Sequence, residues 1–94
     1  MKTGVTIIAE ERYRQIHGEE YSFDHDDKEL NGNLSNAAAC YAVPNGPKRI
    51  KIVKELWPWN NSAWKPSPLL RIKELAKAGA LIAAEIDRLQ RIKQ

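Results

Sequence analysis

The stretch from residue 67 to residue 94 constrains the fold more than any other part of the chain. Its apolar and small residues recur in alternating steps of three and four positions, which places them along one side of an α-helix. This seam consists of Ile72, Leu75, Gly79, Ile82, Ile86 and Leu89. Ser67 is a good N-cap and Pro68 suits the first turn, so a helix is predicted over 67–92. We expect the seam to face the core, with Gly79 where another backbone comes nearest.

Two shorter helices are predicted ahead of the long one, over about 3–17 and 27–42. The first places near one face Val5, Ile8, Ala9, Arg12, Tyr13 and Ile16. The second places on one face Leu30, Leu34, Ala37 and Tyr41, and it contains Gly32. Residues 44–66 form a loop, in which 48–56 is either a short helix or an extended piece. We expect residues 1–94 to form a single all-α domain, a small three- to four-helix bundle with an irregular Trp/Pro-rich connection before its long C-terminal helix.

Composition limits the class of protein. With 94 residues, 43% of them hydrophobic, the chain suits one domain with a modest core. No apolar run approaches the roughly 18 residues that span a bilayer, and the apolar run near the N-terminus ends in two acids, unlike a secretory signal. The single Cys40 cannot form an internal disulfide and is interpreted as a buried, inert thiol. These features favour a cytoplasmic protein that does not associate with membranes.

Charged residues gather in two connecting regions of opposite sign. Residues 19–29 are mostly acidic, whereas residues 48–54 are basic and contain no acid. In the acidic region, Asp26 with Glu29 three positions later fits an N-cap with a capping box. The alternative is that His25, Asp26 and Asp27 contact a metal or an active-site water. The net charge of only +3 and the acidic region argue against nucleic acid as a partner.

Three tryptophans, Trp57, Trp59 and Trp64, lie close together in the predicted loop. One interpretation is a hydrophobic plug that caps one end of the bundle, because the predicted helices supply few large side chains. The other interpretation is an aromatic surface on which a base or a partner stacks. Nearby cations would then contact phosphate. These cations are Lys48, Arg49, Lys51, Lys54 and Lys65.

Several short motifs follow one another in the order typical of one family. They are ERYRQI from residue 11, HDD from 25, GNLSNAAACYA from 32, WPW from 57, WKP from 64 and KAGALIAAEIDRL from 77. The ordered set, which spans nearly the whole chain, resembles a family of small phage and prophage proteins of unassigned function. Glu29 stands where the family pattern usually has a second His, and Asn33 stands where it has Glu. These departures affect any metal site that relatives would form at those two positions.

A more distant resemblance is to the phage MazG-like nucleotide pyrophosphohydrolases, which are all-α proteins that pack as dimers. Their chemistry needs several carboxylates on two helices to hold Mg²⁺ against a triphosphate. The corresponding stretch here, residues 32–36, contains no carboxylate, and the last helix offers Glu74 and Glu85, three turns apart and without a neighbouring Asp at the right spacing. The resemblance therefore implies the fold and a nucleotide-sized pocket, without a complete metal cluster.

Together these observations favour a non-catalytic binding protein without a cofactor, whose ligand is a nucleotide-like phosphorylated molecule or a host protein. No residue is assigned a catalytic or metal-binding role. The candidate ligand-binding residues are Glu11, Arg12, His25, Asp26, Asp27, Trp57, Trp59, Trp64, Lys65, Lys77 and Glu85.

Two alternatives remain open. The first is a metal-dependent, MazG-like nucleotide pyrophosphohydrolase that uses Mg²⁺ at Glu10, Glu11, His25, Asp26, Asp27 and Glu85. The second is a structural adaptor that works through dimerisation. A homodimer is expected because the predicted last helix spans about 40 Å, whereas the two shorter helices span about 22 Å and leave part of the seam uncovered.

Overall fold

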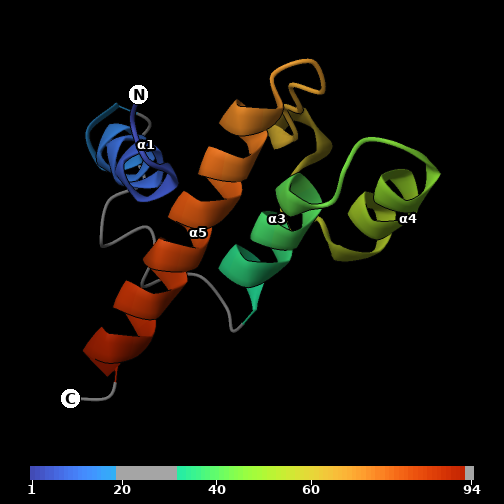
Figure 1. Cartoon of the computed structure of the whole chain (residues 1–94). Helices are drawn as coiled ribbons and strands as arrows, with labels where there is room; N and C mark the ends of the chain where they lie inside the picture. The colour runs from blue at the N-terminus through green and yellow to red at the C-terminus, as the bar shows by residue number, and fades with distance from the viewer. Residues whose placement is uncertain (19–31, 93–94) are drawn as a thin grey trace.

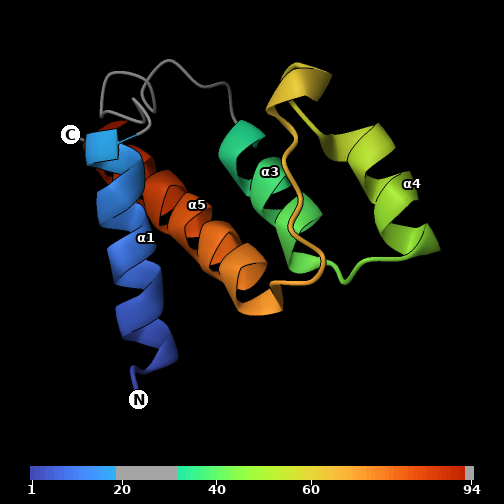
Figure 2. The ribbon, with the colours of Figure 1, turned by 90° about the horizontal axis from the view of Figure 1, so that it is seen from above.

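The computed structural model describes residues 1–18 and 32–92 of the chain. These ranges contain four α-helices and one short 3-10 helix: α1 (Gly4–Gly18), α3 (Asn33–Ala42), α4 (Pro47–Leu56), η1 (Asn61–Ala63) and α5 (Arg71–Ile92). The long helix α5 lies in the middle, with α1 on one side and α3 on the other (Figure 1). From above, α4 lies beyond α3, away from α5 (Figure 2). The predicted all-α bundle with a long C-terminal helix is confirmed.

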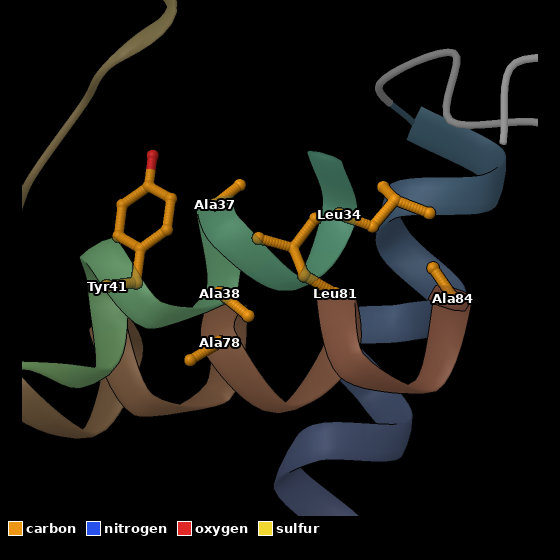
Figure 3. Packing of buried hydrophobic residues seen from close by; sticks show 7 residues of the cluster. All are labelled: Leu34, Ala37, Ala38, Tyr41, Ala78, Leu81 and Ala84. Carbon is orange, nitrogen blue, oxygen red and sulfur yellow. The ribbon is translucent and has the colours of Figure 1, made fainter. Parts of the chain in front are cut away.

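The hydrophobic core lies between α3 and α5, and small residues dominate it. Its buried members are Leu34, Ala37, Ala38 and Tyr41 from α3 and Ala78, Leu81 and Ala84 from α5 (Figure 3). Alanine side chains let two helix backbones approach closely, because the distance between helix axes depends on the side chains at the contact. The three tryptophans pack against this cluster from one end and supply the large apolar side chains that the helices lack.

Apart from Gly79, the apolar seam predicted to face the core lies on the opposite side of α5, so that prediction is wrong. The five large seam residues are between 40% and 69% exposed; they are Ile72, Leu75, Ile82, Ile86 and Leu89. The buried apolar residues of α5 are instead Ala76, Ala78, Ala80, Leu81 and Ala84. The spacing identified a continuous apolar side correctly, but α1 and α3 pack where the smaller residues permit closer contact.

Helix α1 crosses α5 most closely at Gly79. A Cβ atom at this position would lie 2.6 Å from Cδ1 of Ile8. The nearest atoms therefore belong to a side chain of α1 and not to the backbone that was predicted to come nearest at Gly79. The buried face of α1 agrees only in part with the predicted one: Arg12 is buried as expected, but Val5 and Tyr13 are exposed and Gln15 is buried.

Two predicted helix starts are displaced. Helix α5 begins at Arg71 and not at residue 67: residues 68–69 form a turn, and the Ser67 amide donates to Glu74 Oε2 at 2.8 Å. Gly32 lies at the N-cap of α3 and not inside the helix. Its φ of 90° is in the left-handed region, which glycine adopts without steric cost. The predicted helix from 27 to 31 lies outside the described residues.

Residues 48–56, predicted as either a short helix or an extended piece, are helical. Residues Pro47–Leu56 form α4, which has a proline in its first turn and Trp57 as its C-cap. Cys40 on α3 is fully buried, as predicted. Its burial raises the pKa of the thiol, so the group stays protonated.

No helix in residues 1–18 or 32–92 combines the length and the apolar character needed to cross a bilayer.

A buried carboxylate joins the ends of three helices. Glu74 is 1% exposed, and its Oε1 accepts from Arg49 Nη1 at 2.8 Å and from Arg71 Nη1 at 3.1 Å. The Arg71 guanidinium also donates to the carbonyl oxygens of Tyr41 and Ala42 at the end of α3. The hydrogen bond from Arg49 is the main reason that the pKa of Glu74 is lowered to about 2, so this carboxylate is ionised at neutral pH.

Candidate functional site

The tryptophans form a compact aromatic cluster with Tyr41 of α3. Trp57 packs edge-on against Trp59 and Trp64, with ring centroids 5.3 Å and 5.0 Å apart. The ring of Tyr41 lies 4.7 Å from that of Trp64. All three tryptophans are half-buried and packed against the core. The arrangement is that of the predicted hydrophobic plug, and it also leaves ring surface available at its edge.

Hydrogen bonds hold the loop that carries these rings at several points. The indole N–H of Trp57 donates to the carbonyl oxygen of Asn60 at 3.0 Å. The amide of Lys65 donates to the hydroxyl oxygen of Tyr41 at 3.4 Å, and that of Ser67 donates to buried Glu74. Tyr41 lies on α3 and Glu74 lies on α5. These last two hydrogen bonds therefore hold the backbone at Lys65 and Ser67 against the bundle.

Beside the aromatic cluster lies a cavity of about 300 Å³. Trp57, Trp59 and Tyr41 provide aromatic walls, and Leu81 and Ala63 add apolar contacts. The polar part of the lining comes from Gln15 of α1, Lys65 of the loop and Lys77 of α5. The Lys77 ammonium lies 5.2 Å from the centre of the Tyr41 ring, within the range of a cation–π interaction.

A second cavity, of about 510 Å³, adjoins the first. Its lining consists of Glu11, Arg14, Lys65, Pro66, Ser67, Lys73 and Lys77, so Lys65 and Lys77 belong to both cavities. We call the two cavities together the aromatic–lysine cleft. Among the described side chains of the cleft, Glu11 is the one acid. It accepts from Arg14 Nε at 2.8 Å and Nη2 at 2.6 Å.

Of the residues predicted to bind ligand, the cleft brings together Glu11, Trp57, Trp59, Lys65 and Lys77. These come from α1, from the loop and from α5, so segments far apart in the sequence build one site. Trp64 belongs to the aromatic cluster but does not line the cleft. The guanidinium carbon of Arg49 lies 5.1 Å from its ring centre. The predicted residues His25, Asp26 and Asp27 lie outside the described part of the chain.

Two predicted site residues have other surroundings. Arg12 is buried, with Nη2 3.5 Å from Oδ2 of Asp87 on α5. Glu85 is held by Arg88, whose Nε lies 2.7 Å from its Oε1. Glu85 also lies eight positions beyond Lys77, about 12 Å along the helix. Neither residue lines either cavity of the cleft.

The predicted phosphate-binding cations also need correction. Arg49 is 2% exposed and is bound to Glu74, so it serves the core. Three others, Lys48, Lys51 and Lys54, are exposed on α4, and none of them lines the cleft. The cleft instead contains Lys73 and Arg14, which sequence reasoning missed. The spacing of Lys73 and Lys77, four positions apart on one helix, was the available signal.

Gln15 is the other cleft residue that the sequence did not single out. It is 2% exposed, and its Nε2 donates to Glu11 Oε2 at 3.3 Å. Glu11 and Gln15 are four positions apart and therefore share one side of α1. That spacing in the ERYRQ motif was a usable signal, because Gln is rarely buried without a polar role.

Within residues 1–18 and 32–92, no group of three or more His, Cys, Asp or Glu side chains is placed to hold a metal ion. Comparisons of this chain with protein-family models, with curated proteins and with solved structures find no match.

Proposed function

We propose that this protein binds a nucleotide-like phosphorylated ligand in the aromatic–lysine cleft without transforming it. The observation that carries the proposal is the sharing of Lys65 and Lys77 between an aromatic cavity and a cationic one. A molecule that has a flat ring at one end and a phosphate at the other matches this order of surfaces. The two cavities, of about 300 and 510 Å³, each fall in the size range of small-molecule sites, about 300 to 1,000 Å³.

The aromatic end provides the ring-binding surface. Trp57 and Trp59 are held nearly perpendicular to each other, at 89°, so a planar ligand meets one face and one edge. Stacking of a base on an aromatic side chain contributes about 1–3 kcal/mol. Because the rings already pack against the core, little side-chain entropy is lost when the ligand binds.

The cationic end provides the phosphate-binding surface. Lys65, Lys73, Lys77 and Arg14 line the second cavity against a single described acid, Glu11. Lysine ammonium groups act as adaptable point charges toward phosphate, and charge-assisted hydrogen bonds are about twice as strong as neutral ones. The excess of positive charge therefore favours an anionic ligand group over a neutral one.

The hydrogen bonds that Glu11 already accepts support binding without catalysis. Its carboxylate accepts hydrogen bonds from Arg14 and Gln15, which occupy lone pairs that a metal ion would otherwise need. A metal-dependent hydrolase needs several carboxylates that converge on the ion. Such an enzyme, built with residues of the 25–27 segment, remains the alternative proposal.

Titration calorimetry and tryptophan fluorescence against a panel of nucleoside mono-, di- and triphosphates test the proposal. We expect saturable binding that quenches or shifts the tryptophan emission, with the parent nucleosides binding at least about tenfold more weakly. Trp59→Leu and Lys77→Ala should each weaken binding about tenfold, whereas Lys51→Ala on α4 is the matched lysine control. Absence of heat and of any spectral change across the panel would refute the proposal. Release of pyrophosphate or phosphate in the presence of Mg²⁺ would favour the enzyme instead.

A second proposal concerns the exposed apolar seam of α5. We propose that it pairs with the same seam of a second copy of this chain, which forms a homodimer. The seam residues repeat in steps of three and four, the spacing by which one helix packs against another of the same repeat. From Ile72 to Leu89 the seam runs about 25 Å. Five large, exposed apolar side chains in one line are unusual on a monomer and mark an association surface.

Light scattering at micromolar concentration tests this pairing. The wild-type chain should have twice the mass of one chain, and Ile82→Glu should give the monomer mass because a charge is placed in the paired seam. Ile50→Glu on α4 is the matched control, since Ile50 is also exposed but lies outside the seam. A monomeric wild-type chain, or equal effects of the two substitutions, would contradict the proposal.

A further inference from the structure

Gln15 lines the aromatic cavity, and its side chain carries a buried carbonyl oxygen. Its side chain is 2% exposed and lines the cavity together with Trp57, Trp59 and Lys77. Within the described part of the chain, its Oε1 accepts no hydrogen bond. A buried acceptor without a donor costs free energy, because its hydrogen bonds to water are lost and not replaced. The position is therefore suited to a donor that arrives with a ligand.

The orientation of this amide is fixed by its neighbours. Nε2 of Gln15 donates to Glu11 Oε2 at 3.3 Å, and Glu11 is itself held by two bonds from Arg14. If the amide turned over, its carbonyl oxygen would face the Glu11 carboxylate, two acceptors without a proton between them. The Glu11–Arg14 pair thus holds the Gln15 nitrogen on its own side and leaves the oxygen as the acceptor.

We propose that Gln15 determines ligand specificity by accepting a hydrogen bond from a ring amino or imino N–H group of the ligand. This inference rests on the proposed function, and it narrows the ligand class to phosphorylated heterocycles that carry such a donor. The ring stacks at Trp57 and Trp59, its N–H edge meets Gln15, and its phosphate lies toward Lys65 and Lys77. All five side chains line the aromatic cavity.

A site that hydrogen-bonds its ligand discriminates against an analogue that lacks the donor, because the buried acceptor is then left unpaired. The expected discrimination is about tenfold to a hundredfold in affinity. Stacking and phosphate contacts are the same for both analogues, so the ratio of their affinities isolates the contribution of Gln15.

Two matched pairs of probes test the inference. Adenosine 5′-monophosphate is compared with purine riboside 5′-monophosphate, which lacks the amino group, and uridine 5′-monophosphate with its N3-methyl derivative, which lacks the imino hydrogen. Calorimetry on the wild-type chain should show at least about tenfold preference for the donor-bearing member of one pair. Gln15→Met, which keeps the length of the side chain but removes its carbonyl, should reduce that preference to less than about twofold.

The outcomes separate this inference from the proposed function. Equal binding of both members of each pair by the wild-type chain overturns the role of Gln15 and leaves nucleotide binding standing. No binding of any probe overturns the proposed function itself. If Gln15→Met weakens both members equally and the preference persists, Gln15 only supports the shape of the cavity and the inference is wrong. Thermal melting of the variant identifies a folding defect, which would affect both members of a pair alike.

Discussion

The two long sides of α5 are both apolar, yet the side with the smaller residues is the one that is buried. Ala76, Ala80 and Ala84 are at most 6% exposed, whereas Ile82 and Ile86 are about half exposed. Burial of the isoleucines would remove more apolar surface from water, so hydrophobicity alone predicts the reverse. The comparison shows that closeness of packing decided which side α1 and α3 cover.

The buried side also contains charge, which the exposed seam does not. Glu74 and Arg88 are 1% and 4% exposed, and each is held in an ion pair. The covered side of α5 is thus a fitted surface of small and paired polar groups. The open side offers large apolar groups that suit a second helix from another molecule. Three predictions test this division, from the largest expected effect to the smallest.

Replacement of Glu74 by leucine should lower the free energy of unfolding more than any other change proposed for the buried side of α5. Arg49 would lose its carboxylate partner while it remains 2% exposed, and an uncompensated buried charge costs about 3–5 kcal/mol of unfolding free energy. Denaturation in urea measures the loss. Glu55→Leu on the exposed face of α4 is the control and should change stability by less than about 0.5 kcal/mol. Equal losses in the two variants would show that the Glu74 network does not stabilise the fold.

Lowering the pH should gradually remove the stability that the ionised carboxylate of Glu74 contributes. The pKa of Glu74 is about 2 in the folded protein, below its ordinary value of 4.5. Because the folded pKa is the lower one, the unfolded chain binds the proton first as the pH falls. Stability from this group is therefore complete above pH 4.5 and is lost as the pH falls toward 2, with a total of at most about 3 kcal/mol.

Urea denaturation at several pH values checks this dependence. The difference in unfolding free energy between the wild-type chain and Glu74→Gln should shrink steadily from pH 5 to pH 2. The variant serves as the control, because its other carboxylates titrate as in the wild type. A difference that stays constant over this range would contradict the lowered pKa of Glu74.

A matched pair of substitutions compares the two sides of α5 directly. Ala80 is fully buried, so Ala80→Leu forces extra volume between packed helices and should cost about 1–3 kcal/mol. Ile82→Gln on the open side should change the stability of the monomer by less than about 0.5 kcal/mol. Both are measured by denaturation at low protein concentration. If Ile82→Gln proves the more destabilising, the assignment of the buried side is wrong.

Local features of the sequence predicted the helices well. The first helix was expected over about 3–17 and is found at Gly4–Gly18, and the end of the second at Ala42 agrees with the structure. The start of α5 was misplaced: residues 68–69 form a turn, and the Ser67 amide donates to Glu74, seven positions away, ahead of the helix. That hydrogen bond depends on the buried position of Glu74, which the local sequence does not reveal.

The candidate site was predicted in part. Trp57, Trp59, Lys65 and Lys77 were selected for their chemistry, and they do line one cleft. Arg49 was misassigned because a cation that binds a phosphate and one that binds a buried carboxylate look alike in sequence. The partner of Arg49 lies 25 positions away, beyond any local pattern.

The all-α class, the presence of a long C-terminal helix and the aromatic character of the connection before it could be predicted from the sequence alone. These follow from periodicity, capping and composition, which act over a few neighbouring residues. The packing of the bundle was needed to show which side of α5 is buried, which arginines pair with Glu74 and how Gln15 comes to line a cavity with Trp57 and Trp59. The physical reason is that burial depends on how well surfaces from distant segments fit together, and that fit is a property of the assembled bundle.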